Sequence, residues 1–338
     1  MTLTQTAILT KRLMIFGAVF TLVILLSWIG FLLFKAQQPK PIAEPPKPTY
    51  LFGQIPYPAF PQSEHSAANK TFTLDTETGN LPTDLPTLAK VYAVPPQGSS
   101  FAAPDRIKAQ AKKFGFTNEP EIVDPTHYRF TDELGGVLNI DLSTNNFTFE
   151  RPYTENNDAN LIIEDKQTLV SIFKSYLSSK GLLKPEISQG KAEAIYNQNS
   201  QRETTRATIT IWPANLDNLE IVTPQYNLGL IVGEAIKSGD NEKRFIRLNY
   251  TYWEPDLISS ANATYSLIPP TEAFTQLREN KGVIIISPAT GNISITNVKL
   301  AYYQTEEYQI YIQPVYVFEG PNFAAYVPAL TSEYLQPN

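Results

Sequence analysis

The chain of 338 residues contains no cysteine and only two histidines, and charged residues make up no more than 18% of it. The absence of cysteine excludes disulfides, thiol catalysis, thiolate zinc sites and iron–sulfur clusters. Two histidines are too few for a multi-histidine metal centre within one chain. A net charge of −6 argues against nucleic acid as the main partner. We therefore expect no metal, no cofactor and no nucleic-acid partner.

Apolar, aromatic and proline residues are abundant. Hydrophobic residues make up 42% of the chain, which is enough for a core and excludes wholesale disorder. The 18 tyrosines, 18 phenylalanines and 27 prolines favour strands and turns over long helices. The length indicates two domains, or one domain with sizeable appendages.

One long uncharged run lies near the start of the chain, at residues 13–34. A helix of that length reaches about 33 Å, against about 30 Å for the hydrocarbon core of a bilayer. Lys11, Arg12 and Lys35 bracket the run, as is typical of membrane-spanning helices. The run is longer than the apolar region of a signal peptide and apolar all round, unlike a buried soluble helix. It predicts a retained transmembrane helix with the lipid bilayer as partner.

The predicted topology is single-pass. Residues 1–12 carry two basic residues and no acid, whereas the part after the helix is large and acidic. This asymmetry favours a signal anchor with a cytoplasmic tail at 1–12 and an extracytoplasmic C-terminal domain. Localisation in the cell membrane of a bacterial envelope follows. Gly17 and Thr21 have a small-x-x-x-small spacing, which makes them the candidate contact for a partner helix.

A proline-rich linker is predicted over residues 35–69, where prolines forbid continuous helix or central strand. Its second half mixes proline with Tyr50, Phe52, Tyr57 and Phe60 and can pack onto the domain that follows.

Three rounds of one pattern, an amphipathic helix and then alternating strands, follow at residues 70–155, 156–255 and 256–338. The predicted fold class is α+β: an N-terminal transmembrane helix, a proline-rich linker, then helix-plus-antiparallel-sheet modules.

Local signals place the three helices. Pro104 opens the first and Gly115 can close it, Asp165 caps the second, and Pro270 begins the third. The second helix has apolar residues at helical spacing, namely Leu169, Ile172, Phe173, Tyr176 and Leu177.

No catalytic or metal motif in the sequence is coherent. His127 stands at the head of a predicted strand without a serine or cysteine motif beside it. Ser171 and Lys174 match S-x-x-K, but the other elements of that signature are missing or out of order. The acidic run at residues 75–80 lacks the glutamate that completes a calcium loop. We therefore predict no catalytic residue, no cofactor-binding residue and no metal ligand.

The C-terminal 75 residues, 264–338, contain a helix at 272–277 and three strands at 298–303, 311–320 and 323–330. This arrangement resembles the PepSY-like modules of bacterial cell-envelope proteins. In particular it is similar to the membrane-anchored YycH/YycI-type accessory proteins of two-component systems. The resemblance implies a non-enzymatic domain that binds or regulates a protein partner, such as a membrane sensor kinase.

Two alternatives stay open from the sequence. One is an enzyme acting on cell-wall polymers, with Asp132, Glu133 and Asp141 as its acid and base. The other is a passive structural component of a surface assembly. A cleft with converging carboxylates would favour the enzyme, and a hydrophobic groove or an open sheet edge would favour binding.

Overall fold

The structure is a computed structural model. It describes residues 14, 16–17, 20–31, 47–63, 65–68, 70–95, 101–153, 163–198, 204–258, 262–288 and 291–336. The chain divides into two units, Met1–Lys47 and Pro48–Asn338.

The transmembrane helix predicted at residues 13–34 is not found. In the part of the chain that the structure describes, no helix is long and apolar enough to cross a membrane. Of residues 13–34, the structure describes 14, 16–17 and 20–31, and all of these are helical. The predictions of a transmembrane helix, a signal anchor and a single-pass cell-membrane localisation are therefore wrong. They relied on the apolar run, on the basic residues beside it and on the charge asymmetry of the chain; the other residues of 13–34 lie outside the described residues.

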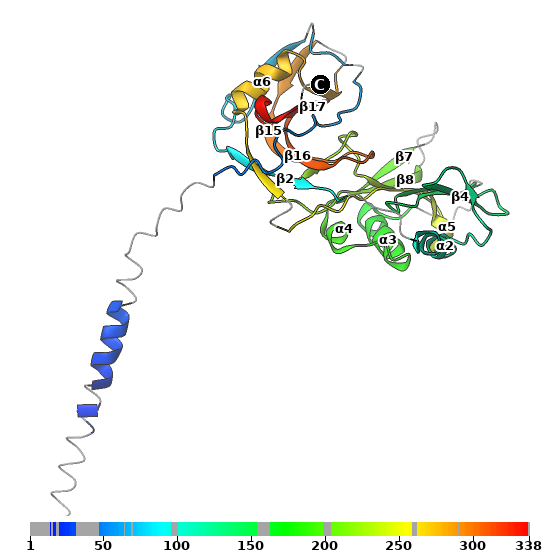
Figure 1. The fold of residues 1–338 in the computed structure, drawn as a ribbon, viewed down its shortest axis with the longest axis horizontal. Helices are drawn as coiled ribbons and strands as arrows, with labels where there is room; N and C mark the ends of the chain where they lie inside the picture. The colour runs from blue at the N-terminus through cyan, green and yellow to red at the C-terminus, as the bar shows by residue number, and fades with distance from the viewer. Residues whose placement is uncertain are drawn as a thin grey trace, which may run out of the picture. The chain divides into compact units, whose positions relative to one another are not determined.

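The larger sheet of the second unit has eight antiparallel strands in the order β3-β4-β5-β6-β11-β10-β8-β7 (Figure 1). Their bounds are β3 (Glu121–Ile122), β4 (His127–Thr131), β5 (Val137–Asp141), β6 (Phe147–Glu150), β7 (Ala192–Gln198), β8 (Thr204–Ile211), β10 (Ile231–Ile236) and β11 (Phe245–Tyr250). Strands β6 and β11 pair in the middle, with Glu150 opposite Arg247 and Phe147 opposite Tyr250. The sheet therefore joins two similar four-stranded halves, one from each of the first two predicted modules.

Four helices accompany this sheet, and Figure 1 shows them on one of its faces. They are α2 (Ala103–Lys113), α3 (Lys166–Ser179), α4 (Pro185–Gln189) and α5 (Asn241–Arg244). As predicted, the Asp165 side chain caps α3 by accepting hydrogen bonds from the backbone N–H groups of Gln167 and Thr168. Phe173 of α3 packs directly on the backbone at Gly233, where an added Cβ would lie 2.5 Å from the ring carbon Cε2. Glycine at this position therefore sets how closely α3 approaches the sheet.

Residues on the larger sheet that point away from this core are mainly polar or charged. Arg247 contacts Glu150 at 2.7 Å and Glu234 at 3.3 Å, and Arg206 contacts Glu234 at 2.9 Å. These pairs cross neighbouring strands, as expected for a solvated sheet face.

The smaller sheet has seven strands, with the path β12-β2-β16-β15-β9 and with β17 joining β16 to β13. Their bounds are β2 (Leu88–Ala93), β9 (Ile221–Val222), β12 (Asn262–Ser266), β13 (Val283–Ile286), β15 (Asn297–Tyr303), β16 (Tyr311–Gly320) and β17 (Phe323–Pro328). A separate parallel pair is formed by β1 (Thr71–Leu74) and β14 (Asn292–Ile295). Helix α6 (Pro270–Arg278) buries Ala273 and Leu277, and a 3-10 turn, η2 (Ser332–Tyr334), follows β17.

The predicted linker is in part a piece of this fold. Ile55 is fully buried and forms a bridge with Leu335, while Tyr50 stacks on Tyr334 with ring centroids 4.1 Å apart. Ala67 is also buried in the same core. The aromatic half of the segment thus packs on the domain, as its composition indicated, because its apolar side chains have a core to enter.

The predicted fold class is therefore wrong in its arrangement. The described chain is dominated by two large multi-strand sheets and has no transmembrane helix. Strand β2 from the first predicted module and β9 from the second both belong to the smaller sheet. An alternating pattern predicts which face of a strand is buried, but it does not predict which other strand pairs with that strand.

Candidate functional site

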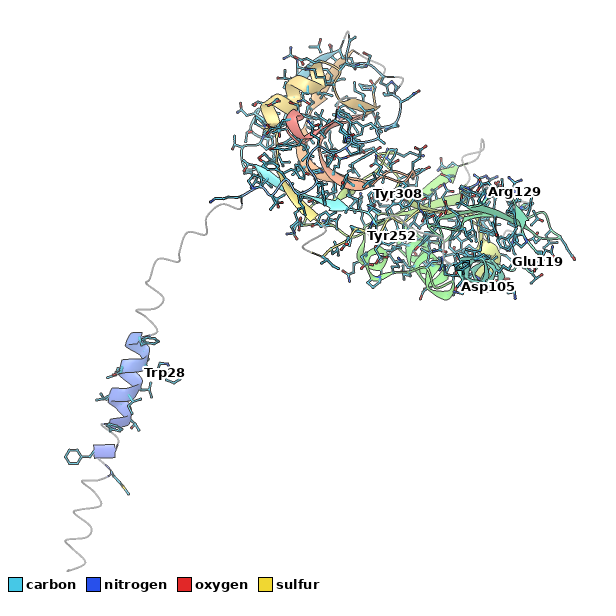
Figure 2. All side chains as sticks on the ribbon, in the orientation of Figure 1. Trp28, Asp105, Glu119, Arg129, Tyr252 and Tyr308 are labelled. Atoms are coloured by element: carbon cyan, nitrogen blue, oxygen red, sulfur yellow. The ribbon has the colours of Figure 1, made fainter. Side chains whose placement is uncertain are left out.

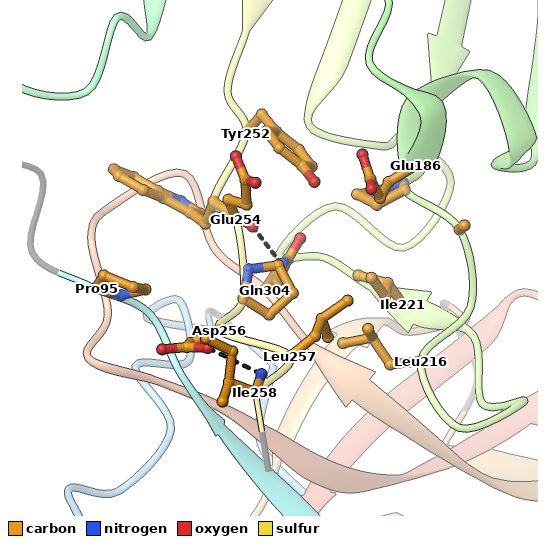
Figure 3. Close-up of a pocket in the computed structure, with 14 residues that line it drawn as sticks. Pro95, Glu186, Leu216, Ile221, Tyr252, Glu254, Asp256, Leu257, Ile258 and Gln304 are labelled. Atoms are coloured by element: carbon orange, nitrogen blue, oxygen red, sulfur yellow. Dashed lines mark hydrogen bonds between the residues drawn. The ribbon is translucent and has the colours of Figure 1, made fainter. Parts of the chain in front are cut away.

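A pocket of about 520 Å³ lies between chain segments that leave the two sheets (Figure 3). From the larger sheet come the residues after β8 and those after β11. From the smaller sheet come β9 and the residues after β2 and β15, while α4 adds Glu186. The lining residues are Pro95, Glu186, Pro213, Ala214, Leu216, Ile221, Tyr252, Trp253, Glu254, Pro255, Asp256, Leu257, Ile258 and Gln304.

Hydrogen bonds between the two sides fix the wall of this pocket. The indole Nε1 of Trp253 donates to the carbonyl oxygen of Thr305 at 2.7 Å. In return, the Gln304 side-chain Nε2 donates to the carbonyl oxygen of Trp253 at 3.3 Å. Both residues are buried, so the segment after β11 and the segment after β15 are locked together.

Oε1 of Gln304 is a buried polar atom in the pocket with no hydrogen-bond partner among the described residues. The hydroxyl of Tyr252 also makes no hydrogen bond of good geometry there, although Glu186 is close enough to act as a weak acceptor that raises its pKa. Tyr252 is 7% exposed and Gln304 2%. Figure 3 shows both side chains reaching into the space beside Glu186. A buried polar atom left unpaired costs about 1–3 kcal/mol. Both atoms are themselves buried, so a polar group of a ligand completes their bonding only by inserting directly beside them.

Tyr252 is held in its neutral form. Burial, and then the negative charges of Glu186 and Glu254, raise the pKa of its hydroxyl well above the usual value. At neutral pH the hydroxyl therefore keeps its proton and can both donate and accept a hydrogen bond.

The charged groups around the pocket are mostly acidic. Glu186, Glu254 and Asp256 line it. Lys184 is the nearby cation: its Nζ lies 2.6 Å from Glu254 and 4.6 Å from the ring centroid of Tyr252. Asp256 accepts a hydrogen bond from the backbone N–H of Ile258 at 2.9 Å. Three carboxylates against one ammonium leave the site with a negative potential.

An apolar rim, defined as Leu257, Ile258, Tyr308 and Ile310, lies next to the pocket. Leu257 and Ile258 are 59% and 67% exposed, unusually high for large apolar side chains. Val94, which follows β2, holds two members of the rim: Tyr308 donates to its carbonyl at 2.8 Å, and its N–H donates to the carbonyl of Ile310. Tyr308 also packs edge-on against Trp253, and Figure 2 labels it together with Tyr252. Clustered exposed apolar side chains of this kind mark interaction sites.

Hydrogen bonds from Lys90, Tyr92 and Tyr302 to Asp217 hold the pocket wall that contains Leu216; we call these four residues the Asp217 clip. Asp217 has a positive φ of 47°, and its carboxylate accepts hydrogen bonds from Lys90 at 2.9 Å, Tyr92 at 2.7 Å and Tyr302 at 3.3 Å. Burial raises the pKa of Asp217, but the hydrogen bonds from Lys90 and Tyr92 outweigh it and bring the pKa below its usual value. The carboxylate is therefore ionised at neutral pH and anchors the turn to the smaller sheet.

The residues singled out in the sequence lie elsewhere. His127, at the exposed start of β4, has its Nδ1 2.9 Å from Asp124 and its Nε2 3.6 Å from Asp141, which ends the neighbouring strand β5. Ser171 donates within α3 to the carbonyl of Gln167 at 3.0 Å. Neither side chain lies in the pocket.

Two of the three carboxylates of the enzyme alternative, Asp132 and Asp141, stabilise turns. Asp132 accepts hydrogen bonds from the backbone N–H groups of Leu134 and Gly136, at 2.9 and 2.6 Å. Asp141 accepts from those of Ser143 and Thr144, at 2.7 and 3.0 Å. Within the described ranges, no group of three or more His, Asp or Glu side chains could hold a metal ion.

Gly17 and Thr21, the candidate contact for a partner helix, lie one turn apart in the first unit. The Thr21 hydroxyl donates to the carbonyl oxygen of Gly17 at 3.0 Å. Nothing described lies within 4 Å of a Cβ placed on Gly17. The contact with a partner helix stays a prediction.

Sequence reasoning missed the pocket altogether. Its only local signal is the run from Tyr252 to Asp256, in which aromatic, acidic and proline residues follow a strand. Gln304 is about 50 positions away along the chain, so no spacing rule connects the two.

Comparison with known proteins adds little. No protein-family model matches the chain, and no curated protein matches it. Among solved structures, the chain is similar to an uncharacterized protein from Eubacterium rectale ATCC 33656, with 13% identity and a TM-score of 0.39 over 73% of this chain and 84% of that one.

Proposed function

We propose that residues 48–338 form a non-catalytic module that binds a segment of another protein and thereby regulates it. The observation that carries this proposal is the pocket with the unpaired Tyr252 hydroxyl and Gln304 Oε1 beside the exposed apolar rim. An apolar concavity with a few convergent polar groups is the usual form of a binding site. The PepSY-like resemblance of residues 264–338 supports a sensor kinase as the regulated partner.

The chemistry of the site supports binding over catalysis. The pocket combines a tyrosine held neutral, an amide and carboxylates that lie around an apolar wall. These groups can recognise a ligand by hydrogen bonds and charge. Catalysis by a hydroxyl or amine nucleophile would also need such a group beside a base, and the pocket lining contains no serine, threonine, lysine or histidine. Of the three carboxylates in the lining, Glu254 pairs with Lys184 at 2.6 Å and Asp256 accepts a hydrogen bond from the backbone N–H of Ile258 at 2.9 Å, so two of the three already have a partner within the chain.

The experiment selects heptapeptides from a displayed random library on the full chain and measures their dissociation constants. The test variant is Leu257→Asp in the apolar rim, and the matched control is Leu134→Asp, since Leu134 is 78% exposed in the β4–β5 turn. We expect the selected peptides to bind the control as they bind the unaltered chain. They should lose about tenfold or more in affinity with Leu257→Asp, which corresponds to about 1.4 kcal/mol. Failure to select any peptide, or equal binding to both variants, would contradict the proposal.

A further inference from the structure

The pocket offers hydrogen-bond acceptors without matching donors. Oε1 of Gln304 can only accept, and so can the carboxylate of Glu186. The neutral Tyr252 hydroxyl has one proton to share between them. Figure 3 shows these three groups facing the same space. A ligand group that fits must therefore bring several donors at once.

The charges around the pocket also favour a ligand group that carries hydrogen-bond donors. Among the described residues, Lys184 forms its ion pair with Glu254, and no lysine or arginine forms an ion pair with Glu186 or Asp256. Two carboxylates at the pocket are thus without a cation. A positively charged ligand group would be attracted, and a carboxylate would be repelled.

The walls suit a cation that is carried on an apolar stem. Leu216 and Ile221 present aliphatic surface, and Trp253 and Tyr252 present the aromatic surface that Tyr308 and Lys184 leave uncovered. A guanidinium or ammonium gains from aromatic faces, while its methylene stem packs on apolar side chains. The exposed Leu257 then remains for an apolar neighbour on the same peptide.

We propose that this pocket binds an arginine side chain of the partner segment, with an apolar residue next to it that covers the rim formed by Leu257, Ile258, Tyr308 and Ile310. This inference deepens the proposed function and rests on it. Arginine fits better than lysine because its planar group brings five N–H donors in a fixed fork, whereas an ammonium brings three.

The test uses four capped tripeptides, N-acetyl-Leu-X-Leu-amide, in which X is arginine, lysine, citrulline or glutamate. Citrulline has nearly the shape of arginine without its charge. Binding to the full chain is followed in nitrogen–proton spectra through the indole signals of its three tryptophans. We expect the Trp253 signal to move while those of Trp28 and Trp212 stay in place. Affinity should fall in the order arginine, lysine, citrulline, glutamate, with about a tenfold step between arginine and citrulline.

Two pocket variants separate charge from shape. Glu186→Gln and Asp256→Asn should each reduce the preference for arginine over citrulline, without affecting citrulline binding. The matched control is Glu193→Gln on β7, where the carboxylate already pairs with Lys191 at 2.9 Å. Thermal unfolding of each variant shows whether it is folded. If only one of the two pocket variants folds, that one is enough for the test. Added salt should also narrow the difference between arginine and citrulline.

The outcomes distinguish this inference from the function on which it rests. Equal binding of arginine and citrulline, or tighter binding of glutamate, overturns the cation preference and leaves peptide binding intact. If no tripeptide moves the Trp253 signal while selected heptapeptides still depend on Leu257, the arginine pocket is wrong and the proposed function stands. If neither probe binds, both are wrong.

Discussion

The indole Nε1 of Trp253 donates a 2.7 Å hydrogen bond to the carbonyl oxygen of Thr305. Trp253 follows β11 of the larger sheet, and Thr305 follows β15 of the smaller one. The two residues are far apart in sequence, so this bond exists only after both sheets have formed. The pocket wall that this bond holds therefore forms only when both sheets of the second unit are folded.

The first prediction tests that bond. Trp253→Phe removes the donor and leaves the Thr305 carbonyl without it, so the free energy of unfolding should fall by about 1–3 kcal/mol. Denaturant unfolding measures the change. As a control, Trp28→Phe alters an exposed indole and should change stability by no more than about 0.5 kcal/mol. Equal effects of the two substitutions would show that the bond contributes little.

The second prediction concerns the predicted linker. Ile55 is fully buried, so Ile55→Ala should lower the free energy of unfolding by about 2–5 kcal/mol through lost burial and the cavity left behind. Leu51→Ala removes a similar side chain that is 58% exposed, and should cost far less. A free linker around Ile55 would instead give two small and similar changes in chemical denaturation.

The third prediction tests the contact between α3 and the larger sheet. Gly233→Ala places a methyl group against the ring of Phe173, and overpacking of this kind costs about 1–3 kcal/mol. The double variant Gly233→Ala with Phe173→Leu should lose less free energy of unfolding than the two single variants lose together, because the smaller side chain relieves the clash. Strict additivity in a double-mutant cycle would argue against this contact.

The fourth prediction concerns stability at alkaline pH. Burial raises the pKa of Tyr316 from 10.0 to about 12, and its hydroxyl donates to the carbonyl of Ile268 at 2.7 Å. A group with a raised pKa in the folded state contributes stability that is complete below its unfolded pKa and is lost as pH rises through the folded value. Stability should therefore fall between about pH 10 and pH 12.

Tyrosinate absorbance and circular dichroism, recorded together, check this prediction. Ionisation of the buried tyrosines should coincide with unfolding, and Tyr316→Phe should make the alkaline loss of stability less steep. Tyrosine ionisation well before any loss of structure would contradict the burial of these hydroxyls.

The fifth prediction concerns stability at acidic pH and the Asp217 clip on the pocket wall. The pKa of Asp217 is lowered in the folded state from its ordinary value of 3.8. Its contribution to stability is therefore present above about pH 4 and is lost as pH falls through the folded value. Asp217→Asn should weaken the dependence of stability on pH between about pH 5 and pH 2, because the ionisable group is gone. Acid unfolding of Asp84→Asn, an exposed residue, should follow that of the unaltered chain.

Local sequence patterns predicted the local elements well. The apolar positions of the second predicted helix include Leu169, Phe173 and Leu177, and all three are fully buried in α3. Its cap at Asp165 is also confirmed. These predictions succeeded because a helix depends on residues three or four positions apart and on its own ends.

The uncharged run at residues 13–34 led to a wrong prediction. A run of apolar residues indicates that a segment can enter a bilayer, but it does not establish that the segment forms one spanning helix. In the part of the chain that the structure describes, no helix is long and apolar enough to cross a membrane, and the fold class and localisation that assumed one were wrong.

The sequence by itself determined the three longer helices of the second unit, α2, α3 and α6, and the C-terminal strands β15, β16 and β17, because these depend on neighbours in the chain. It did not predict the short helices α4 and α5, nor that β16 and β17 would be buried on both faces. Only the tertiary structure decided that β6 pairs with β11 and that β2 joins β16, because any alternating strand can pair with any exposed edge. The pocket was decided at the same level. Tyr252 and Gln304 meet only when both sheets have formed, since folding brings together residues that no local pattern connects.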